Sequence, residues 1–208
     1  MRKSHRWSIV LRLCGIVTSI GFGVTVAAGV EPAASTIAGR TLSEWSAKLN
    51  SSNRTVRRMA ALTLGAFGPR AVPALTGALA DDDAAVRYWA ASELGDIGPP
   101  AGSARPQLKR LLTGKSFAVR LSAAYALCRL GDLHTGLPIL AKGLTVVDKG
   151  TNVSAADFLA RIGPPAKAAV PALKKAIADE QHSKRRSVIH VARAAEEALR
   201  RIAGGTLP

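Results

Sequence analysis

The sequence predicts an all-α fold, a right-handed α-solenoid of about five helical hairpins that follows an N-terminal signal segment. Three observations support this fold class. The chain of 208 residues is 48% hydrophobic but only 4% aromatic, so its core must consist mainly of small aliphatic side chains, which favours closely packed helices. An apolar pattern of helical spacing recurs five times, and a shorter pattern that begins at proline recurs between the copies. Recurrence about every 30 to 40 residues is typical of stacked helical repeats.

The first 28 residues are the predicted export signal. The opening MRKSHRW is basic, and the run from Leu13 to Val30 is uncharged and largely apolar. The small residues at Val26, Ala27 and Ala28 offer a cleavage site for signal peptidase. We therefore expect residues 1–28 to be a signal peptide and the mature protein to be periplasmic or extracellular. The alternative is an uncleaved signal that anchors the protein in a membrane through residues 13–30, a run at the short limit for a span.

The longer repeated element is an amphipathic helix that ends at glycine. From its first position, apolar residues follow at offsets of 4, 8 and 11, which trace one helical face. The first positions of the five copies are Val56, Val86, Val119, Thr151 and Val191. Offset 12 is glycine in four copies, namely Gly68, Gly98, Gly131 and Gly163. Glycine accepts the left-handed conformation that closes a helix, so these four are predicted structural residues. The predicted N-cap residues stand three positions before the first position and are Asn53, Asp83, Ser116 and Asp148.

A shorter helix precedes each copy. Its proline recurs at Pro73, Pro106, Pro138 and Pro171, and proline is tolerated in the first turn of a helix. In the same register Trp45 takes a Leu position, so we predict that Trp45 is a structural core plug capping the first repeat. The predicted pairs are 41–49 with 53–67, 71–80 with 83–97, 104–113 with 117–130, 136–144 with 150–162, and 168–178 with 183–203. One hairpin cannot bury its apolar stripe alone, so the copies must stack.

These pairs divide the chain into a linker at residues 29–40, the solenoid at residues 41–203 and a tail at residues 204–208. Within the fourth pair, Gly136, Gly143 and Gly150 interrupt the helices. Glycine inside a helix costs about 1 kcal/mol relative to alanine. We therefore expect this part of the solenoid to be the least stable.

The segment VRRMAALTLGAFGPRAVPAL, which begins at Val56, resembles the HEAT repeat, in particular the HEAT-like repeat of proteins related to bilin lyases. The resemblance covers residues 41–203, and the leader followed by GRTLSEWSAKL is similar to exported bacterial HEAT-repeat proteins. HEAT repeats often carry an Asp before the second helix and an Arg inside it, which form a ladder. Here the Arg position holds Arg57, Arg87 and Arg120, but Asn152 and Ala192 in later copies. The resemblance therefore implies a solenoid with an incomplete ladder.

Basic residues are the first candidates for binding a partner. Those near the starts of the second helices are Arg57, Arg58, Arg87, Arg120 and Arg193. Second helices usually line the concave face of this architecture, so these residues predict a shared basic groove. The alternative is that each Arg binds carbonyls or an acid of a neighbouring repeat, as Arg87 would with Asp83 one turn earlier.

The densest basic run is HSKRRSVIH, which contains Lys184, Arg185 and Arg186. One interpretation is a contact for an acidic polymer or an anionic membrane surface. The other is the solvated outer face of a terminal cap. Tyr88 is predicted to be exposed and to anchor a partner, whereas its neighbour Trp89 lies on the flank of the buried stripe and is predicted to pack in the core.

The sequence offers no catalytic constellation. Cys128 falls on a small-residue position between packed helices, which predicts a buried structural thiol. His134, His182 and His190 have no partner residues at metal-ligand spacing. We therefore predict that the protein is not an enzyme and has no catalytic residue, metal site or cofactor.

Three functions stay open. The leading one is a non-enzymatic scaffold or adaptor of the cell envelope that presents a curved basic surface to another protein. The second is a basic solenoid that binds a polyanion, since the net charge is +15; export argues against nucleic acid as that partner. The third, implied by the resemblance, is a lyase or lyase-chaperone, and the lack of an acid, base and nucleophile argues against it. The oligomeric state is not fixed by the sequence.

Overall fold

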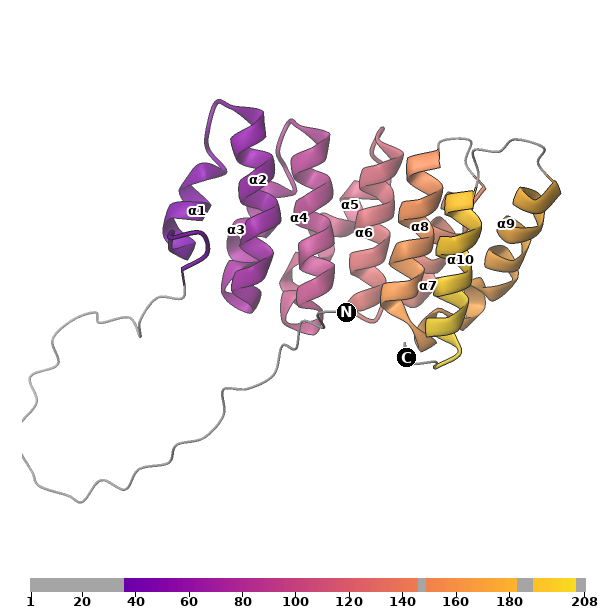
Figure 1. Ribbon diagram of the computed structural model, residues 1–208. Helices are drawn as coiled ribbons and strands as arrows, with labels where there is room; N and C mark the ends of the chain where they lie inside the picture. The colour runs from indigo at the N-terminus through magenta and orange to yellow at the C-terminus, as the bar shows by residue number, and fades with distance from the viewer. Residues whose placement is uncertain (1–35, 146–148, 183–188, 205–208) are drawn as a thin grey trace, which may run out of the picture. The chain divides into compact units, whose positions relative to one another are not determined.

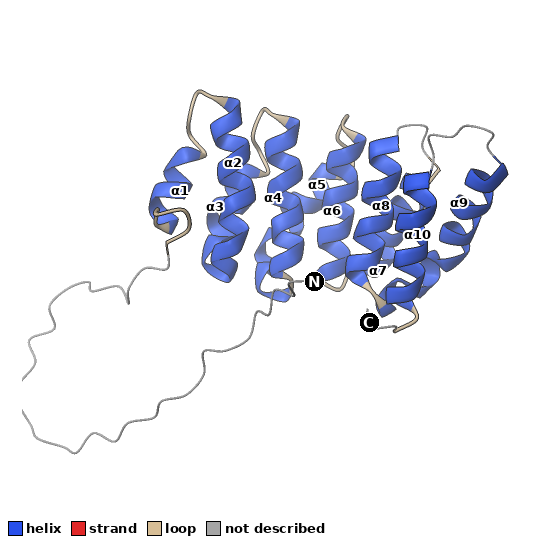
Figure 2. Cartoon of the chain, viewed as in Figure 1, coloured by secondary structure: helices blue, strands red, loops and turns tan. Residues whose placement is uncertain are grey.

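A computed structural model describes residues 36–145, 149–182 and 189–204, and these residues are helical apart from their turns and one isolated bridge (Figure 2). The predicted signal segment, residues 29–35 of the linker and residues 205–208 lie outside the described residues. Lys184, Arg185, Arg186 and the predicted N-cap residue Asp148 also lie outside them. Among the helices that are described, none is long and apolar enough to cross a membrane.

The described helices form hairpins, which confirms the predicted solenoid of helical repeats. The first helices are α1 (Leu42–Lys48), α3 (Val72–Ala78), α5 (Arg105–Leu111), α7 (Leu133–Gly143) and α9 (Val170–His182). The second helices are α2 (Arg54–Leu64), α4 (Ala84–Ile97), α6 (Phe117–Arg129), α8 (Lys149–Ile162) and α10 (Ile189–Ile202). The second helices lie side by side, and each packs on the first helix of its own hairpin (Figure 1). Short 3₁₀ segments join hairpins at η1 (Gly65–Ala71), η2 (Pro99–Ala104) and η3 (Pro164–Ala169).

The predicted caps explain where these helices begin and end. The side chains of Asn53, Asp83 and Ser116 accept hydrogen bonds from backbone N–H groups in the first turns of α2, α4 and α6. The four predicted structural glycines have positive φ angles, 62° at Gly68, 74° at Gly98, 95° at Gly131 and 71° at Gly163. This conformation is strained for other residues, and Gly98, Gly131 and Gly163 lie just past the ends of α4, α6 and α8 as predicted. The predicted helix 53–67 is shorter than expected, because α2 ends at Leu64 and Gly68 lies inside η1.

Helix α7 departs from the prediction, because it begins at Leu133 rather than at residue 136. In other hairpins proline follows the closing glycine and starts a 3₁₀ segment, but here Asp132 follows Gly131. The Asp132 carboxylate accepts a hydrogen bond from the Thr135 N–H at 3.2 Å, so a new helix starts at once. Pro138 consequently lies inside the helix instead of in its first turn.

The core consists of two clusters of buried side chains that meet at α6. The first runs from Trp45 to Leu130 and the second from Leu121 to Ile202. Trp45 is only 6% exposed, which confirms its predicted burial, and its Nε1–H donates to the Ile37 carbonyl at 2.8 Å. Helix α6 contributes Leu127 to the first cluster and Leu121 to the second, so it is buried on two sides.

Candidate functional site

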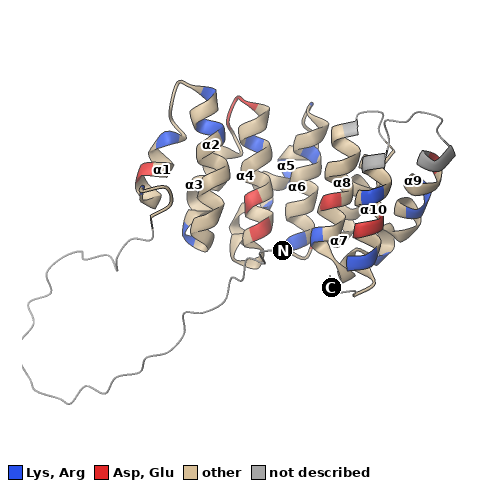
Figure 3. Ribbon diagram, viewed as in Figure 1, with Lys and Arg blue, Asp and Glu red and all other residues tan. Residues whose placement is uncertain are grey.

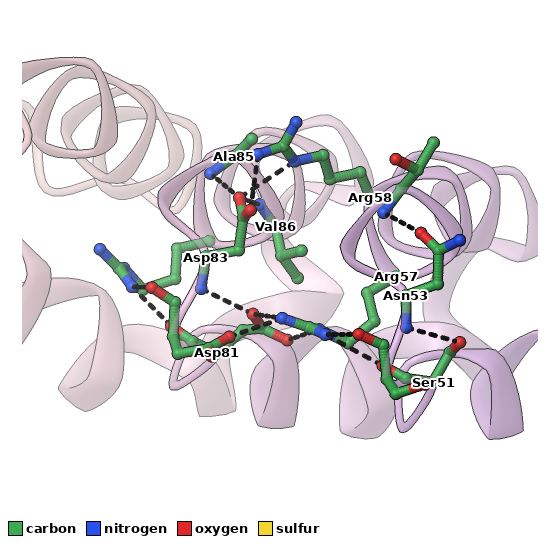
Figure 4. Close-up of polar contacts among 12 residues, drawn as sticks. Ser51, Asn53, Arg57, Arg58, Asp81, Asp83, Ala85 and Val86 are labelled. Carbon is green, nitrogen blue, oxygen red and sulfur yellow. Dashed lines mark hydrogen bonds and ion pairs between the residues drawn. The ribbon is translucent and has the colours of Figure 1, made fainter.

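The ladder predicted from the resemblance is complete between the first two hairpins. Arg57 on α2 binds the Asp81 carboxylate through Nε at 2.8 Å and Nη2 at 3.1 Å, and Nη2 also binds Asp82 at 2.6 Å (Figure 4). Its Nη1 donates to the Ser51 carbonyl at 2.9 Å. The bidentate ion pair with Asp81 fixes both side chains in one orientation. Arg57 therefore joins the loop of its own hairpin to the loop of the next.

Arg58 makes a second link between the same hairpins. Its Nε and Nη2 bind the two oxygens of Asp83 at 3.1 and 2.5 Å (Figure 4). The hydrogen bonds from Arg58 lower the pKa of Asp83 to about 2, and those from the N–H groups at the start of α4 add to the effect. Asp83 thus caps α4 and holds α2 with one carboxylate.

Arg87 and Arg120 occupy the same position in the next two copies but make fewer bonds. Arg87 Nη1 donates to the carbonyls of Asp81 and Asp82 at 2.5 and 2.9 Å. The predicted pair of Arg87 with Asp83 is wrong, because Arg58 already holds that carboxylate. Arg120 Nη1 donates to the Gly114 carbonyl at 2.6 Å. Each of these arginines holds its own loop, and neither pairs with a carboxylate among the described residues.

The predicted basic groove does not form from these residues. Arg57 and Arg58 are engaged with the acids of the neighbouring repeat, as the alternative interpretation held. Arg87 and Arg120 point back to the loops that precede their helices. Arg193 on α10 is exposed and makes no ion pair within the described part of the chain. The physical reason is desolvation, since a half-buried guanidinium is stable only where acceptors surround it.

Tyr88 is half-buried, so its predicted exposure is wrong. Its ring lies 5.1 Å from Trp89 in an edge-to-face arrangement and 6.1 Å from Phe158 of α8, centroid to centroid. Burial raises the pKa of the Tyr88 hydroxyl. Trp89 is also half-buried and packs against the first core cluster, in line with its predicted packing. Tyr88 on α4 thus reaches a side chain of α8 across the intervening α6.

A polar bridge follows the same route across α6. Asp96 of α4 accepts hydrogen bonds from the Tyr125 hydroxyl of α6 and from the Arg161 guanidinium of α8. The Arg161 guanidinium lies 4.7 Å from the centre of the Tyr125 ring, which stacks on Phe158 at 4.5 Å. Burial and the hydrogen bond to Asp96 raise the pKa of Tyr125. Sequence reasoning missed this bridge because its residues lie 29 and 65 positions apart.

The second helices therefore present two different surfaces. Over α6 the face is closed by side chains that α4 and α8 send across it. Over α2 it is open, and the large hydrophobic side chains exposed in the described part of the chain are Met59, at 53%, and Leu62, at 40%. Both lie on α2, one turn apart, so they form an apolar stripe on one side of the helix. We call these two residues the α2 stripe.

Glu93 on α4 meets the chain at Gly65, three residues after Leu62. Its carboxyl group rests against Gly65, which leaves no space for a Cβ there. Burial and the nearby Asp96 raise the pKa of Glu93 to about 7, and Arg161 offsets the rise only in part. No hydrogen bond or ion pair forms between Glu93 and any other described residue. Figure 3 shows acidic residues in the second half of α4, beside an uncharged stretch of α2.

The remaining chemical candidates are structural. Cys128 is buried, and burial together with Asp132 raises the pKa of its thiol to about 12, so it stays protonated at neutral pH. Its position beside Gly136 explains the burial, because Gly136 of α7 lies directly against the Cys128 sulfur. Among the residues that the structure describes, no three His, Cys, Asp or Glu side chains gather where they could hold a metal ion.

Comparison with known proteins agrees with the geometry. Residues 42–127 match the family model of HEAT repeats. The solved complex of CpcE and CpcF of phycocyanin lyase from Nostoc sp. PCC7120 matches at 25% identity and a TM-score of 0.50, covering 86% of this chain and 70% of that one. An engineered protein matches at 21% identity and a TM-score of 0.51, covering 80% of this chain and 83% of the other. No curated protein matches the chain in sequence. The recognised resemblance to HEAT-repeat proteins is therefore confirmed, and the family match extends over residues 42–127.

Proposed function

We propose that the protein is a non-enzymatic adaptor of the cell envelope that binds another protein on the α2 stripe and the adjoining surface of α4. The observation that carries this proposal is the exposure of Met59 and Leu62. Water contact with large apolar side chains costs free energy that a partner recovers by covering them. Over α6 the same face is covered by side chains of α4 and α8, so the α2 stripe is the part of this face that a partner can reach.

Three further observations support the proposal. The basic and apolar leader of residues 1–28 favours export. The chemistry of Cys128, a buried thiol with a raised pKa, favours a structural role over a nucleophilic one. The similar solved structure from Nostoc is itself a complex of two proteins, CpcE and CpcF. A repeat surface that binds another protein is consistent with all three.

The test is crosslinking of the tagged full-length protein in its native envelope fraction, followed by a high-salt wash and mass spectrometry. We expect a discrete partner protein with the wild type and its loss with the double substitution Met59→Gln and Leu62→Gln. Ala168→Gln, at an exposed position of η3, is the control and should retain the partner. A partner that survives the double substitution would refute the assigned surface, and recovery of no protein partner would refute the adaptor. The N-terminal peptide in the same spectrum tests cleavage after residue 28.

A second candidate function is binding of an acidic polymer along the loops. The observation that favours it is Arg87, whose Nε and Nη2 make no bond to any described residue while Lys115 stands in the next loop. Polyanion binding releases counterions, so it weakens steeply with salt. If this candidate is right, the protein will bind polyphosphate or DNA at low salt and release it at high salt, and the Arg87→Gln variant will bind it more weakly.

The lyase alternative rests on the similarity to phycocyanin lyase and requires turnover by the isolated chain.

A further inference from the structure

The first two joints between successive second helices, α2 with α4 and α4 with α6, share one packing feature. A small residue on one helix receives a side chain from the next helix, since a Cβ would clash there. Gly95 of α4 receives the Tyr125 ring of α6, and Gly65 of α2 receives the Glu93 carboxyl of α4. At the second joint the incoming group is aromatic and its hydroxyl is bonded to Asp96. At the first joint the incoming group is an acid without a bonded partner.

This position is unfavourable for a carboxylate in the free protein. The Glu93 side chain is partly buried, and partial removal of a charged group from water without a hydrogen bond or counterion from the chain costs free energy. The charged groups that act on Glu93 are Asp96 on its own helix, which repels it, and Arg161 of α8, which is already bound to Asp96. Helix α2 contributes only Gly65 and uncharged neighbours at this point. No cation of the described chain bonds the Glu93 carboxyl.

The surroundings of Glu93 are apolar on the side of α2. Leu62 lies three residues before Gly65, and Met59 lies three residues before Leu62, so each neighbours the next across one turn. The Glu93 carboxyl therefore meets the chain at Gly65, one turn after Leu62, the second of the two exposed apolar side chains. A small cation would neutralise the acid but leave the stripe in contact with water. A peptide with both a cationic and an apolar part would cover the whole patch.

We propose that Met59, Leu62 and Glu93 form a docking site for a basic amphipathic segment of the partner protein, whose Lys or Arg binds Glu93 while its apolar side chains cover the α2 stripe. This inference rests on the proposed adaptor function and names the chemistry of its partner. The pairing is local, because the chain as a whole is strongly basic and repels a basic segment at long range. The contact is therefore made by the patch and not by the net charge.

The first test is selection from a random 16-residue peptide library displayed on phage, with the full-length protein as bait. We expect the selected peptides to be enriched in Lys or Arg adjacent to apolar residues. Glu93→Gln, which keeps the shape and removes the charge, should bind these peptides at least tenfold more weakly. Glu196→Gln, which removes an exposed acid of α10, is the matched control and should bind like the wild type. Selection of acidic peptides, or of none, would overturn the proposal.

The pH dependence gives a second readout that a merely structural role of Glu93 would not produce. Using a selected peptide that lacks His, Asp and Glu, we expect the wild type to bind more tightly as pH rises through 7, since the carboxyl ionises there. Glu93→Gln should show no such rise. Equal pH profiles would refute the ion pair. If the envelope partner depends on Met59 and Leu62 but Glu93→Gln still retains it, this inference fails while the adaptor function stands.

Discussion

At the scale of single residues, the same side chain has different consequences in successive copies. Arg57, Arg87 and Arg120 all hold the loop that precedes their own helix. Only Arg57 also reaches acids of the following repeat, because Asp81 and Asp82 stand there, whereas Gly114 and Lys115 take those places one repeat later. Identical arginines therefore join two hairpins at the first joint and brace one hairpin at the next.

A comparison of two substitutions tests this difference. Arg57→Gln should lower the thermal midpoint of unfolding more than Arg87→Gln, because it leaves the largely buried Asp81 carboxylate without its cation. Both variants lose the bonds to their own loops, so Arg87→Gln serves as the control for that loss. The measurement is thermal unfolding followed by circular dichroism at neutral pH. Equal midpoints would show that the link between repeats contributes nothing.

The protonation of Glu93 makes a prediction about stability. Its pKa is raised from 4.5 to about 7 in the folded state, so the folded protein keeps a proton that the unfolded chain releases. The contribution of Glu93 to the free energy of unfolding is therefore fully present below pH 4.5 and is lost as pH rises through 7. Relative to Glu93→Gln, the wild type should lose about 1–2 kcal/mol of unfolding free energy over this range, after allowance for solvent screening. Urea unfolding at pH 4.5 and 7.5 measures it, and a constant difference would contradict it.

At the scale of helices, glycine serves two opposite purposes. Gly136 and Gly143 suggested interruptions in the sequence, yet both are buried inside α7 at close contacts with α6 and α8. Gly136 lies against the Cys128 sulfur and the Ala124 carbonyl of α6. Gly77 of α3, in contrast, is exposed and has open space where a Cβ would stand. Where a neighbouring helix occupies the space of the Cβ, as at Gly136, glycine allows close packing. Where that space is open, as at Gly77, glycine only weakens the helix.

Alanine substitutions at two of these positions should have opposite effects. Gly77→Ala should raise the free energy of unfolding by about 0.5–1 kcal/mol, because alanine has less freedom in the unfolded chain and favours the helix. Gly136→Ala should lower it by about 1–3 kcal/mol, because the new methyl group must displace α6. Chemical denaturation of both variants beside the wild type gives the two values. A stabilising Gly136→Ala would refute the close contact.

At the scale of the whole described chain, α6 connects the two core clusters. Its Leu127 packs in the first cluster, its Leu121 and Tyr125 pack in the second, and the side chains of α4 and α8 cover its remaining surface. From Leu121 to Cys128 every residue of α6 is buried, and such a segment opens only when its neighbours separate. In a repeat protein, where each unit contacts only adjacent units, this makes α6 the least accessible segment.

Hydrogen exchange measured by mass spectrometry tests this arrangement. We expect the amides of α6 to exchange more slowly than those of α1, which packs on one hairpin only, because exchange in α6 requires separation of both clusters. Leu127→Ala, which removes a fully buried side chain of α6, should lower the unfolding free energy by about 2–5 kcal/mol. Exchange in α6 as fast as in α1 would contradict the central role of the helix.

The sequence predicted the fold to within a few residues wherever local chemistry decides it. The caps at Asn53 and Ser116 and the closing Gly68 and Gly98 act within a few residues of the helix ends, so spacing alone reveals them. The start of α7 was predicted wrongly because the prediction placed it near Pro138, whereas Asp132 caps the helix one turn earlier.

The candidate site was less accessible to sequence reasoning, because its residues meet only after folding. The partners of Arg57 and Asp96 lie one or two repeats away, and their choice depends on which neighbours have acids or bases at matching heights. The exposure of Met59 and Leu62 depends on whether side chains of the neighbouring helix α4 cover them, and no pattern within α2 shows this. A comparison of the charged residues that stand at the same level along neighbouring helices could have indicated these pairs.

The bridge from α4 to α8 also constrains how such a chain can change in length. Repeat proteins commonly gain or lose whole units by duplication or deletion, since each unit contacts only its neighbours. Asp96 and Arg161 bond across one intervening second helix, so an extra unit placed between α4 and α8 would separate the two charges. If that unit stood between α4 and α6, Tyr125 would also lose its acceptor. Units added before α4 or after α8 leave the bridge intact. Changes in the number of repeats are thereby confined to the two ends of the array, and the central units form a cassette of fixed size.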